Sequence, residues 1–285
     1  MNDDIPVFLQ DLPAAYQLHY HVGLAPNRKQ PFFASPEVRR AIESALRSVC
    51  ERNHYHLLDH ALVDRGLYLL LSLRPEHSVS GAVKAIKGNL WAAVKNLGDP
   101  QPVWSRGIFV RSVGTVNAER VATYVSTQFA HHEVDPVAFE PVSYQRNLAA
   151  MSALRNSAHV VFELNHHFVF VLDRRECFLE PEAARGLVGC LVDSAARQGV
   201  LVWRGEVVPD HVHLVTGLEP SHIPADVASR FLADSWRWLH DRYAAVLRFE
   251  RLENVWRQSY YVGTVGAATT AQVRASLQRW VVART

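Results

Sequence analysis

The segment WSRGIFVRSVG occupies residues 104–114 and returns, 152 positions later, as WRQSYYVGTVG at residues 256–266. Both segments begin with tryptophan, carry an aromatic residue followed by valine in the middle, and end in Val-Gly. Self-similarity at this distance indicates an internal duplication. We therefore predict that the chain consists of two copies of one unit, and the repeat supplies the register in which the copies can be compared.

The composition is that of an ordinary globular protein with room for two hydrophobic cores. The chain has 285 residues, of which 48% are hydrophobic and 20% charged, and its formal net charge is +2. That charge is too small to indicate a nucleic-acid partner by itself. The 3 cysteines lack metal-binding or redox spacing, and no apolar leader or membrane-spanning run is present. These features predict a cytoplasmic protein with reduced thiols and no membrane partner.

Each copy is predicted to alternate strands and helices, with Ser35 capping the first helix. Antiparallel strands with helices on one face make an α+β sandwich. The expected boundaries are a first unit at 1–132, a linker at 133–152 and a second unit at 153–285. Strands are expected at 18–24, 56–63, 67–73, 200–208 and 211–217, extended chain at 159–171, and helices at 36–52, 80–97, 118–130, 182–198, 224–247 and 270–283.

The second copy carries a pair of histidines that the first copy lacks. His211 and His213 stand two residues apart on a predicted strand, so both imidazoles point to one face and Val212 points to the apolar side. Gly66 and Tyr68 stand at the matching places of the first copy. Two neighbouring imidazoles form two thirds of a divalent-metal site, and a third ligand has to come from elsewhere. A surface or half-buried histidine pair is the alternative.

The first copy carries a tyrosine and a glutamine that the second copy lacks. Tyr124 and Gln128 are spaced i, i+4 on a predicted helix and share one face. Ser276 and Trp280 stand at these two places in the second copy. A phenol oxygen can attack phosphorus when a metal polarises the phosphate, and a glutamine carbonyl one turn away can serve as the third ligand of that metal. A tyrosine in the helix core is the alternative.

The order of these motifs resembles that of the single-tyrosine HUH transposases of insertion sequences, including their REP-associated relatives. The sequence PDHVHL at 209–214 and the run from Trp104 to Gln128 carry the resemblance, which extends over nearly the whole chain, twice. It implies two tandem ferredoxin-like domains, with antiparallel sheets and flanking helices, that form an intramolecular pseudo-dimer. It also implies that His211, His213 and Gln128 hold Mg²⁺ or Mn²⁺, and that Tyr124 attacks single-stranded DNA to leave a 5′-phosphotyrosine.

The family's active sites are composite, with the histidines of one subunit facing the tyrosine helix of the other. By this resemblance the two copies complement each other in a fused dimer with one complete site. The degenerate site would then consist of Gly66, Tyr68, Ser276 and Trp280. Because one site holds a single tyrosine, three courses stay open: two chains assemble, the cuts follow in sequence, or the enzyme performs one nick-and-transfer event.

The expected function is therefore metal-dependent nicking and joining of single-stranded DNA, carried out at the nucleoid in the cytoplasm. One alternative is a catalytically silent or regulatory DNA-binding descendant of such a transposase. All four active-site residue types are retained, two in each copy, and this argues against that alternative. A second alternative is a metal hydrolase that acts on something other than nucleic acid, and the placement of Tyr124 argues against that.

Further residues are candidates for contacts with the DNA, which the resemblance implies carries a hairpin. Basic side chains suit phosphate contacts and indoles suit base stacking, with a place in the core as the alternative for the indoles. These residues are Arg106, Arg111, Arg257, Lys84, Lys87, Arg230, Arg237, Trp104 and Trp256. Asp210 and His132 are candidates for support of the metal ligands, with an ordinary turn and a solvated helix end as alternatives. His166 and His167 fall where the family often has a basic strand end that faces the DNA, and the default expectation places them on the solvated surface.

Overall fold

The computed structural model describes residues 5–27, 33, 35–64, 66–97, 104–114, 142–175, 181–252 and 254–282. The first copy contributes β1 (Ala14–Gln17), β2 (His19–Pro26), α1 (Pro36–Arg52), β3 (His56–Val63), β4 (Gly66–Ser72), α2 (Val79–Val94) and β5 (Trp104–Val113). The rest of the chain contributes β6 (Val142–Gln145), β7 (Arg155–Ser157), β8 (Val160–Glu163), β9 (Asn165–Leu172), α4 (Pro181–Arg197), β10 (Leu201–Val208), β11 (His211–Gly217), α5 (Pro224–Phe249), β12 (Trp256–Val265) and α6 (Thr270–Val282). Short 3-10 helices lie at Val7–Leu9, Leu148–Ser152 and Asp173–Arg175.

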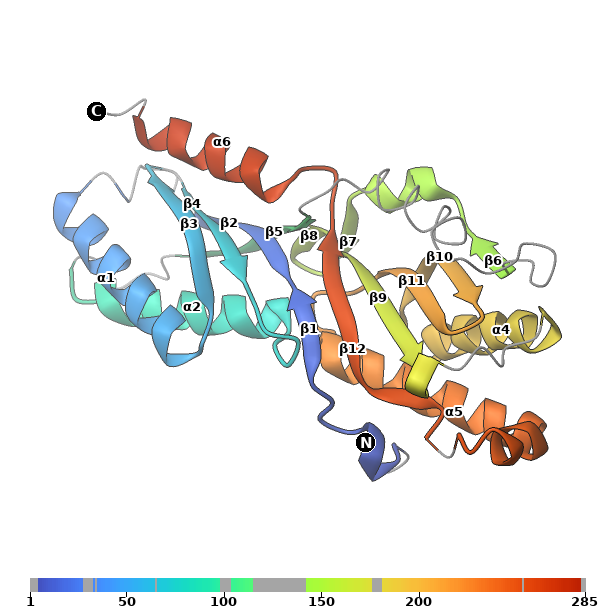
Figure 1. Ribbon diagram of the computed structural model, residues 1–285. Helices are drawn as coiled ribbons and strands as arrows, with labels where there is room; N and C mark the ends of the chain where they lie inside the picture. The colour runs from blue at the N-terminus through green and yellow to red at the C-terminus, as the bar shows by residue number, and fades with distance from the viewer. Residues whose placement is uncertain are drawn as a thin grey trace.

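Four strands at the centre of each sheet follow the ferredoxin-like order. In each copy the chain runs strand, helix, strand, strand, helix, strand. The first sheet contains β3-β4-β2-β5 and the second contains β10-β11-β9-β12, with antiparallel pairing throughout these four. Figure 1 shows α1 and α2 beside the first sheet and α4 and α5 beside the second. The expected class, two tandem ferredoxin-like α+β domains, is confirmed.

Local sequence signals set the helix limits closely. The Ser35 hydroxyl accepts a hydrogen bond from the backbone N–H of Val38, and α1 covers the expected residues. Its apolar side chains recur with helical spacing, so Ile42 and Leu46 are fully buried beneath the sheet. Burial of each such side chain contributes roughly 1.5–3 kcal/mol. The other described helices begin or end within three residues of their expected limits.

The two copies exchange one short strand each. β1 pairs in parallel with β12 of the other copy, and β8 pairs in parallel with β5. Ala14 lies opposite Tyr260 and Val160 lies opposite Ile108, which are matching positions of the duplication. The extended segment expected at 159–171 is therefore two strands of different sheets. Local sequence could not show this break, because both strands are extended and apolar.

Two buried hydroxyl groups tie the joint between the copies. Ser112 Oγ donates to the carbonyl oxygen of Val265 at 2.5 Å, and Thr264 Oγ1 donates to that of Val113 at 2.6 Å. The same two hydroxyls accept the first backbone N–H groups of β9 and β2, both at 2.9 Å. Ser112 and Thr264 occupy matching places in the repeated segment. The end of that segment thus forms the contact through which the copies join.

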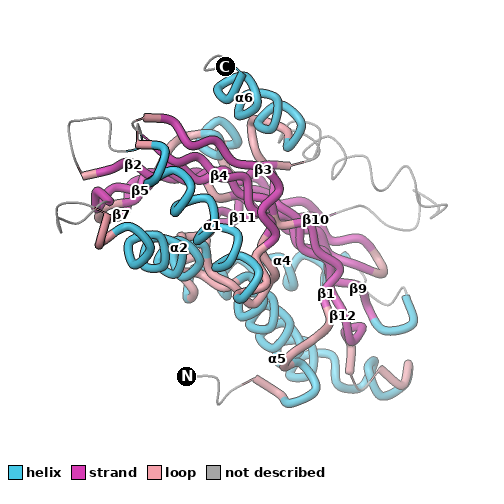
Figure 2. Tube along the Cα trace, turned by 90° about the vertical axis from the view of Figure 1, so that its left-hand side faces the viewer, coloured by secondary structure: helices cyan, strands magenta, loops and turns pink. Residues whose placement is uncertain are grey.

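The helix after the repeated segment also crosses to the other copy. By sequence α6 belongs to the second copy, yet it packs on β3 and β4 of the first (Figures 1 and 2). Val273 and Leu277 of α6 share one apolar cluster with Ala61 and Leu70. Since side chains alternate along a strand, this cluster lies on the face of the first sheet opposite α1 and α2.

The segment expected to link the units is described only from residue 142. There β6 adds an edge strand to the second sheet beside β10, and a 3-10 helix follows. The rest of that segment and the helix expected at 118–130 lie outside the described residues. The unit boundaries therefore stay a prediction. Within the described part of the chain, no helix has the length and apolar character needed to cross a membrane.

Candidate active site

The histidine pair lies in the middle of the second sheet. His211 and His213 belong to β11, which runs between β9 and β10. Val212 and Leu214 point the other way, into the main core beneath α4 and α5. Both imidazoles are buried, at 5% and 3% exposure. The two rings lie on one face of the strand, as their spacing predicts.

The nitrogen atoms of the pair are arranged as metal ligands require. Nε2 of His211 and Nε2 of His213 lie 3.0 Å apart. Behind them, Nδ1 of His211 lies 2.6 Å from Oδ1 of Asp210, and Nδ1 of His213 lies 2.9 Å from Nε2 of His167. A ligating histidine commonly has its second ring nitrogen held by a carboxylate or another polar group, which fixes its tautomer. The residues present therefore fit a divalent ion at the two Nε2 atoms.

The expectation that His166 and His167 lie on the solvated surface is wrong. They are 2% and 8% exposed, because β9 is a central strand with neighbours on both sides. Burial lowers the pKa of His166 to about 3 and that of His167 to about 4. His166 Nε2 lies 2.8 Å from the hydroxyl of Tyr20, which comes from the matching strand of the first copy. Apolar residues on both sides of the two histidines were the available signal for a central strand.

A buried carboxylate that the sequence did not single out lies beside the pair. Glu206 of β10 stands directly opposite His213, so its side chain lies on the same face. It is 2% exposed, and its Oε2 has no hydrogen-bond partner among the described residues. Burial raises the pKa of Glu206, and the neighbouring Arg204 and His211 oppose that rise. The histidine face thus includes a buried carboxyl group on the strand next to the pair.

Within the described ranges, no set of three or more histidine, cysteine, aspartate or glutamate side chains is arranged to hold a metal ion. The two Nε2 atoms would supply two ligands, so a third has to be of another type or come from another part of the chain. Tyr124, Gln128 and His132 lie outside the described residues. Their predicted roles are not tested by the geometry.

In the first sheet, the strand with the residues that match the histidine pair lies beneath α6, which covers this face of the sheet. Tyr68 of β4 packs against the apolar cluster that joins α6 to this sheet, and Gly66 begins the same strand. Ser276 is half-buried on α6, and Trp280 follows it one turn later, with a side chain outside the described set. His21, at the place matching His167, has its ring 6.2 Å from that of Tyr68. Tyr68 thus packs against a cluster that includes Val273 and Leu277 of α6, the helix that carries Ser276, and the predicted degenerate site stays a prediction.

The prediction that Trp104 and Trp256 contact the DNA is wrong. Trp104 and Trp256 are 8% and 1% exposed, so neither indole has a free face on which a base can stack. Trp104 packs against Phe33 with ring centroids 5.5 Å apart, and Trp256 Nε1 donates to Ser235 Oγ at 3.0 Å. Large aromatic side chains in a strand that crosses the core bury most of their surface there. Both residues belong to the core.

The basic candidates differ in what they already contact. Arg111 Nε donates to Glu163 Oε2 at 2.7 Å, an ion pair that joins β5 to β8. Lys87 Nζ donates to the carbonyl oxygen of Ser105 at 2.7 Å. Exposed side chains are those of Lys84, Arg106 and Arg257. These three exposed side chains are better placed for phosphate contacts than Arg111 and Lys87. For all five residues a contact with DNA remains a prediction.

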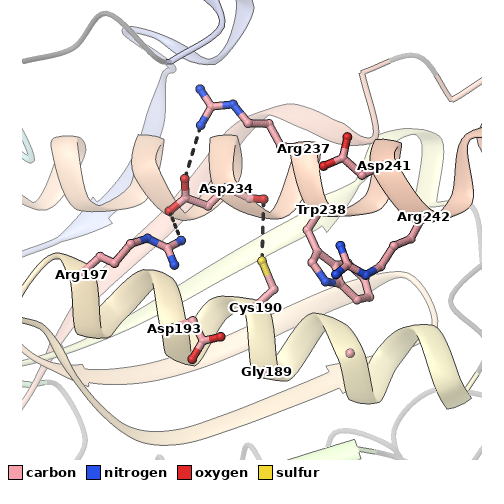
Figure 3. A pocket seen from close by; sticks show the side chains of 10 residues that line it. Gly189, Cys190, Asp193, Arg197, Asp234, Arg237, Trp238, Asp241 and Arg242 are labelled. Carbon is pink, nitrogen blue, oxygen red and sulfur yellow. Dashed lines mark hydrogen bonds and ion pairs between the residues drawn. The ribbon is translucent and has the colours of Figure 1, made fainter.

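Arg237 lies away from the histidine face. It lines a surface cavity of about 600 Å³ between α4 and α5, where Arg197 and Arg237 both contact Asp234 (Figure 3). The N–O distances of these ion pairs are 2.9 Å and 3.5 Å. The two helices cover the face of the second sheet opposite the histidine pair. A DNA contact by Arg237, or by the half-exposed Arg230 on the same helix, would be remote from the histidines.

The chain is similar in sequence to transposases of insertion sequences. Residues 14–128 and 160–279 each match the family model of IS200-like transposases. The ISDra2 transposase TnpA of Deinococcus radiodurans is 32% identical over 114 residues, which cover 40% of this chain and 81% of that protein. The transposase for insertion sequence element IS200 of Salmonella typhimurium is 31% identical over 117 residues, covering 38% of this chain and 75% of that protein.

A solved structure is similar to one part of the chain. It is described as a candidate transposase from Deinococcus radiodurans R1, is 28% identical, and has a TM-score of 0.38. The similarity covers 44% of this chain and 97% of that one. The family match, by contrast, occurs twice, and its two ranges coincide with the two copies of the duplication.

Proposed function

Because the chain belongs to the family of IS200-like transposases, we propose that it cuts and joins single-stranded DNA at one composite active site. The observation that carries the proposal is the crossing of α6 onto the sheet of the other copy. The proposed enzyme depends on Mg²⁺ or Mn²⁺ and works as a monomer whose two copies act like the subunits of a dimer. Its DNA substrate is single-stranded with a hairpin, met at the nucleoid in the cytoplasm.

The duplication relates α6 to the segment that carries the tyrosine. The repeat distance matches Tyr124 with Ser276 and Gln128 with Trp280. Val215 and Val265 of the second sheet form a small apolar cluster on the histidine face, at the places that match Leu70 and Val113 beneath α6. A helix of the first copy crossing in the same way would lie beside that cluster, which also contains Met151 and Trp203. Such a helix would bring Tyr124 and Gln128 over the histidine pair.

In the proposed reaction the phenol oxygen of Tyr124 attacks the scissile phosphorus. A bond forms between this oxygen and phosphorus, and the bond from phosphorus to the 3′ oxygen breaks. The phenol loses a proton, and the leaving oxygen gains one to become a 3′-hydroxyl. The 5′ side of the cut stays on the protein as a phosphotyrosine, and attack by a 3′-hydroxyl on this ester joins the strands again.

His211 and His213, together with Gln128, would hold the divalent ion, which when bound would polarise the phosphate. Asp210 accepts a hydrogen bond from Nδ1 of His211 when that nitrogen carries the proton, which leaves Nε2 as the ligand. Because the acceptor is a carboxylate, this hydrogen bond would be charge-assisted and stronger than one to a neutral acceptor. One tyrosine holds one cut end, so excision of two ends needs two chains or successive cuts.

The decisive test is a covalent DNA adduct. The full chain is incubated with labelled hairpin oligonucleotides and Mn²⁺, and the products are separated under denaturing conditions. We expect an adduct with the natural chain and none with Tyr124→Phe. Tyr68→Phe, which removes the phenol at the degenerate site, is the matched control and should keep the adduct. An adduct that persists in Tyr124→Phe would refute the proposal, and binding without any adduct would favour the silent descendant.

A mixing experiment tests whether one chain makes its own site. Tyr124→Phe and His211→Ala should each be inactive alone. If the site forms within one chain, a mixture of the two variants should stay inactive. Restored cleavage in the mixture would mean that the tyrosine of one chain meets the histidines of another.

A further inference from the structure

We propose that His167 is a positioning residue for the metal site, because it fixes the tautomer and the direction of His213. The inference rests on the proposed function, since it concerns the same pair of histidines. His167 lies on β9 and His213 on the adjacent β11. The planes of their rings are 18° from parallel with centroids 5.1 Å apart, and His167 Nε2 lies 2.9 Å from His213 Nδ1.

The chemistry of neutral imidazole explains why this contact matters. A neutral ring carries one N–H, and the other nitrogen has the free lone pair that binds a metal. Nε2 of His213 faces Nε2 of His211 and so has to be the ligand, which places the proton on Nδ1. That N–H needs an acceptor, and Nε2 of His167 lies at hydrogen-bond distance. His167 would thus favour the one tautomer of His213 that can bind the ion.

The surroundings keep His167 in this orientation. Its side chain is 8% exposed, and the edge of the Tyr261 ring packs against it with centroids 6.0 Å apart. Asp210 makes the corresponding contact with His211 from the turn before β11. Each ligand of the pair is therefore held from behind by a different element, and the two supports are a carboxylate and an imidazole.

The first copy supplies an internal comparison. His21 stands at the matching strand position, but the residue that matches His213 is Tyr68. In this environment His21 Nε2 is buried and has no hydrogen-bond partner in the described part of the chain. The histidine contact thus occurs in the copy that carries the proposed ligands. His21 is accordingly a matched control for the effect of replacing an imidazole at this place in the strand.

The test measures Mn²⁺ binding to the full chain without DNA, by the paramagnetic resonance signal of the free ion. His167→Phe fills the same space without an acceptor and should weaken binding about 10–100-fold. His167→Gln retains an acceptor oxygen and should bind within about 3-fold of the natural chain. His21→Phe should leave the affinity unchanged. Thermal unfolding of each variant reports on folding, and the Gln variant allows the comparison if the Phe variant is unstable.

Counting the imidazoles coupled to Mn²⁺ by pulsed resonance separates positioning from ligation. We expect two coupled imidazoles in both the natural chain and His167→Gln. Three in the natural chain and two in the variant would make His167 a ligand and overturn the inference. Equal affinity of His167→Phe and the natural chain would also overturn it, while leaving the adduct test of the proposed function untouched. A natural chain that binds no Mn²⁺ at His211 would refute both.

Discussion

Tyr20→Phe is expected to weaken the joint between the copies by removing a single oxygen atom. The hydroxyl of Tyr20 lies 2.8 Å from Nε2 of His166, and the two residues are 146 positions apart in the chain. Both are almost fully buried, at 1% and 2% exposure. The other ring nitrogen of His166, Nδ1, is buried without a partner in the described part of the chain. Loss of the hydroxyl would leave the whole imidazole without a hydrogen bond.

The expected cost follows from that burial. Phenylalanine fits the space of tyrosine, so the variant creates no large cavity, and the main effect is an unsatisfied ring nitrogen. Leaving a buried polar group without its partner costs about 1–3 kcal/mol. For a chain of this size, each kcal/mol lowers the melting temperature by roughly 2–4 °C, which predicts a fall of roughly 2–12 °C.

Urea and thermal unfolding would measure this change against Tyr16→Phe. Tyr16 is 39% exposed and makes no hydrogen bond to the described residues through its hydroxyl, so its variant should change the free energy of unfolding by less than about 0.5 kcal/mol. Adding His166→Leu to Tyr20→Phe removes both partners and should recover part of the loss. If Tyr20→Phe and Tyr16→Phe had the same effect, the joint would not depend on this hydrogen bond.

Three further predictions concern stability. Below pH 6.5, protonation of His166 in the unfolded chain should lower the free energy of unfolding by roughly 1.4 kcal/mol per pH unit, because burial holds the folded pKa of His166 at about 3 and the unfolded residue has a pKa near 6.5. In urea titrations at several pH values, the free energy of unfolding should fall less steeply with acidification in His166→Gln than in the natural chain. Equal dependence on pH in the two chains would show that His166 is not the cause. Gly266→Ala should lower the free energy of unfolding by about 1–3 kcal/mol, because the added Cβ would collide with the backbone carbonyl of Ser112 in β5. Gly88→Ala on α2 has open space around the added Cβ and should raise the free energy of unfolding by about 0.5–1 kcal/mol in thermal melts. Arg111→Ala should cost about 1–3 kcal/mol, because it removes the ion-pair partner of the Glu163 carboxylate, which is 2% exposed, while the guanidinium itself is 37% exposed. Adding Glu163→Gln should recover part of the loss in the same melts.

Helices and hairpins followed from local signals. Ser35 and Pro36 mark the start of α1, and the apolar spacing after them predicts its buried face. The turn after Val63 joins two apolar runs, so β3 and β4 pair as expected. These elements were predictable because the interactions that define them join residues only a few positions apart.

The candidate site was predictable in part. The two-residue period of a strand put His211 and His213 on one face without reference to any other element. Their supports could not be found in this way, since His167 and Glu206 come from the two neighbouring strands. Which residues of those strands lie beside the pair depends on strand register, and register follows from the packing of whole strands.

The sequence by itself determined that this protein is a duplication and that its copies kept different chemical groups. A repeat, and the positions at which its two copies differ, can be found by aligning the copies without coordinates. Only the tertiary structure decided how the copies combine. Strands β1 and β8 change sheets, and α6 packs on the sheet of the other copy. The physical reason is that sheet edges and apolar faces are satisfied equally well by a near or a distant partner, so the choice between them depends on the packing of the whole chain.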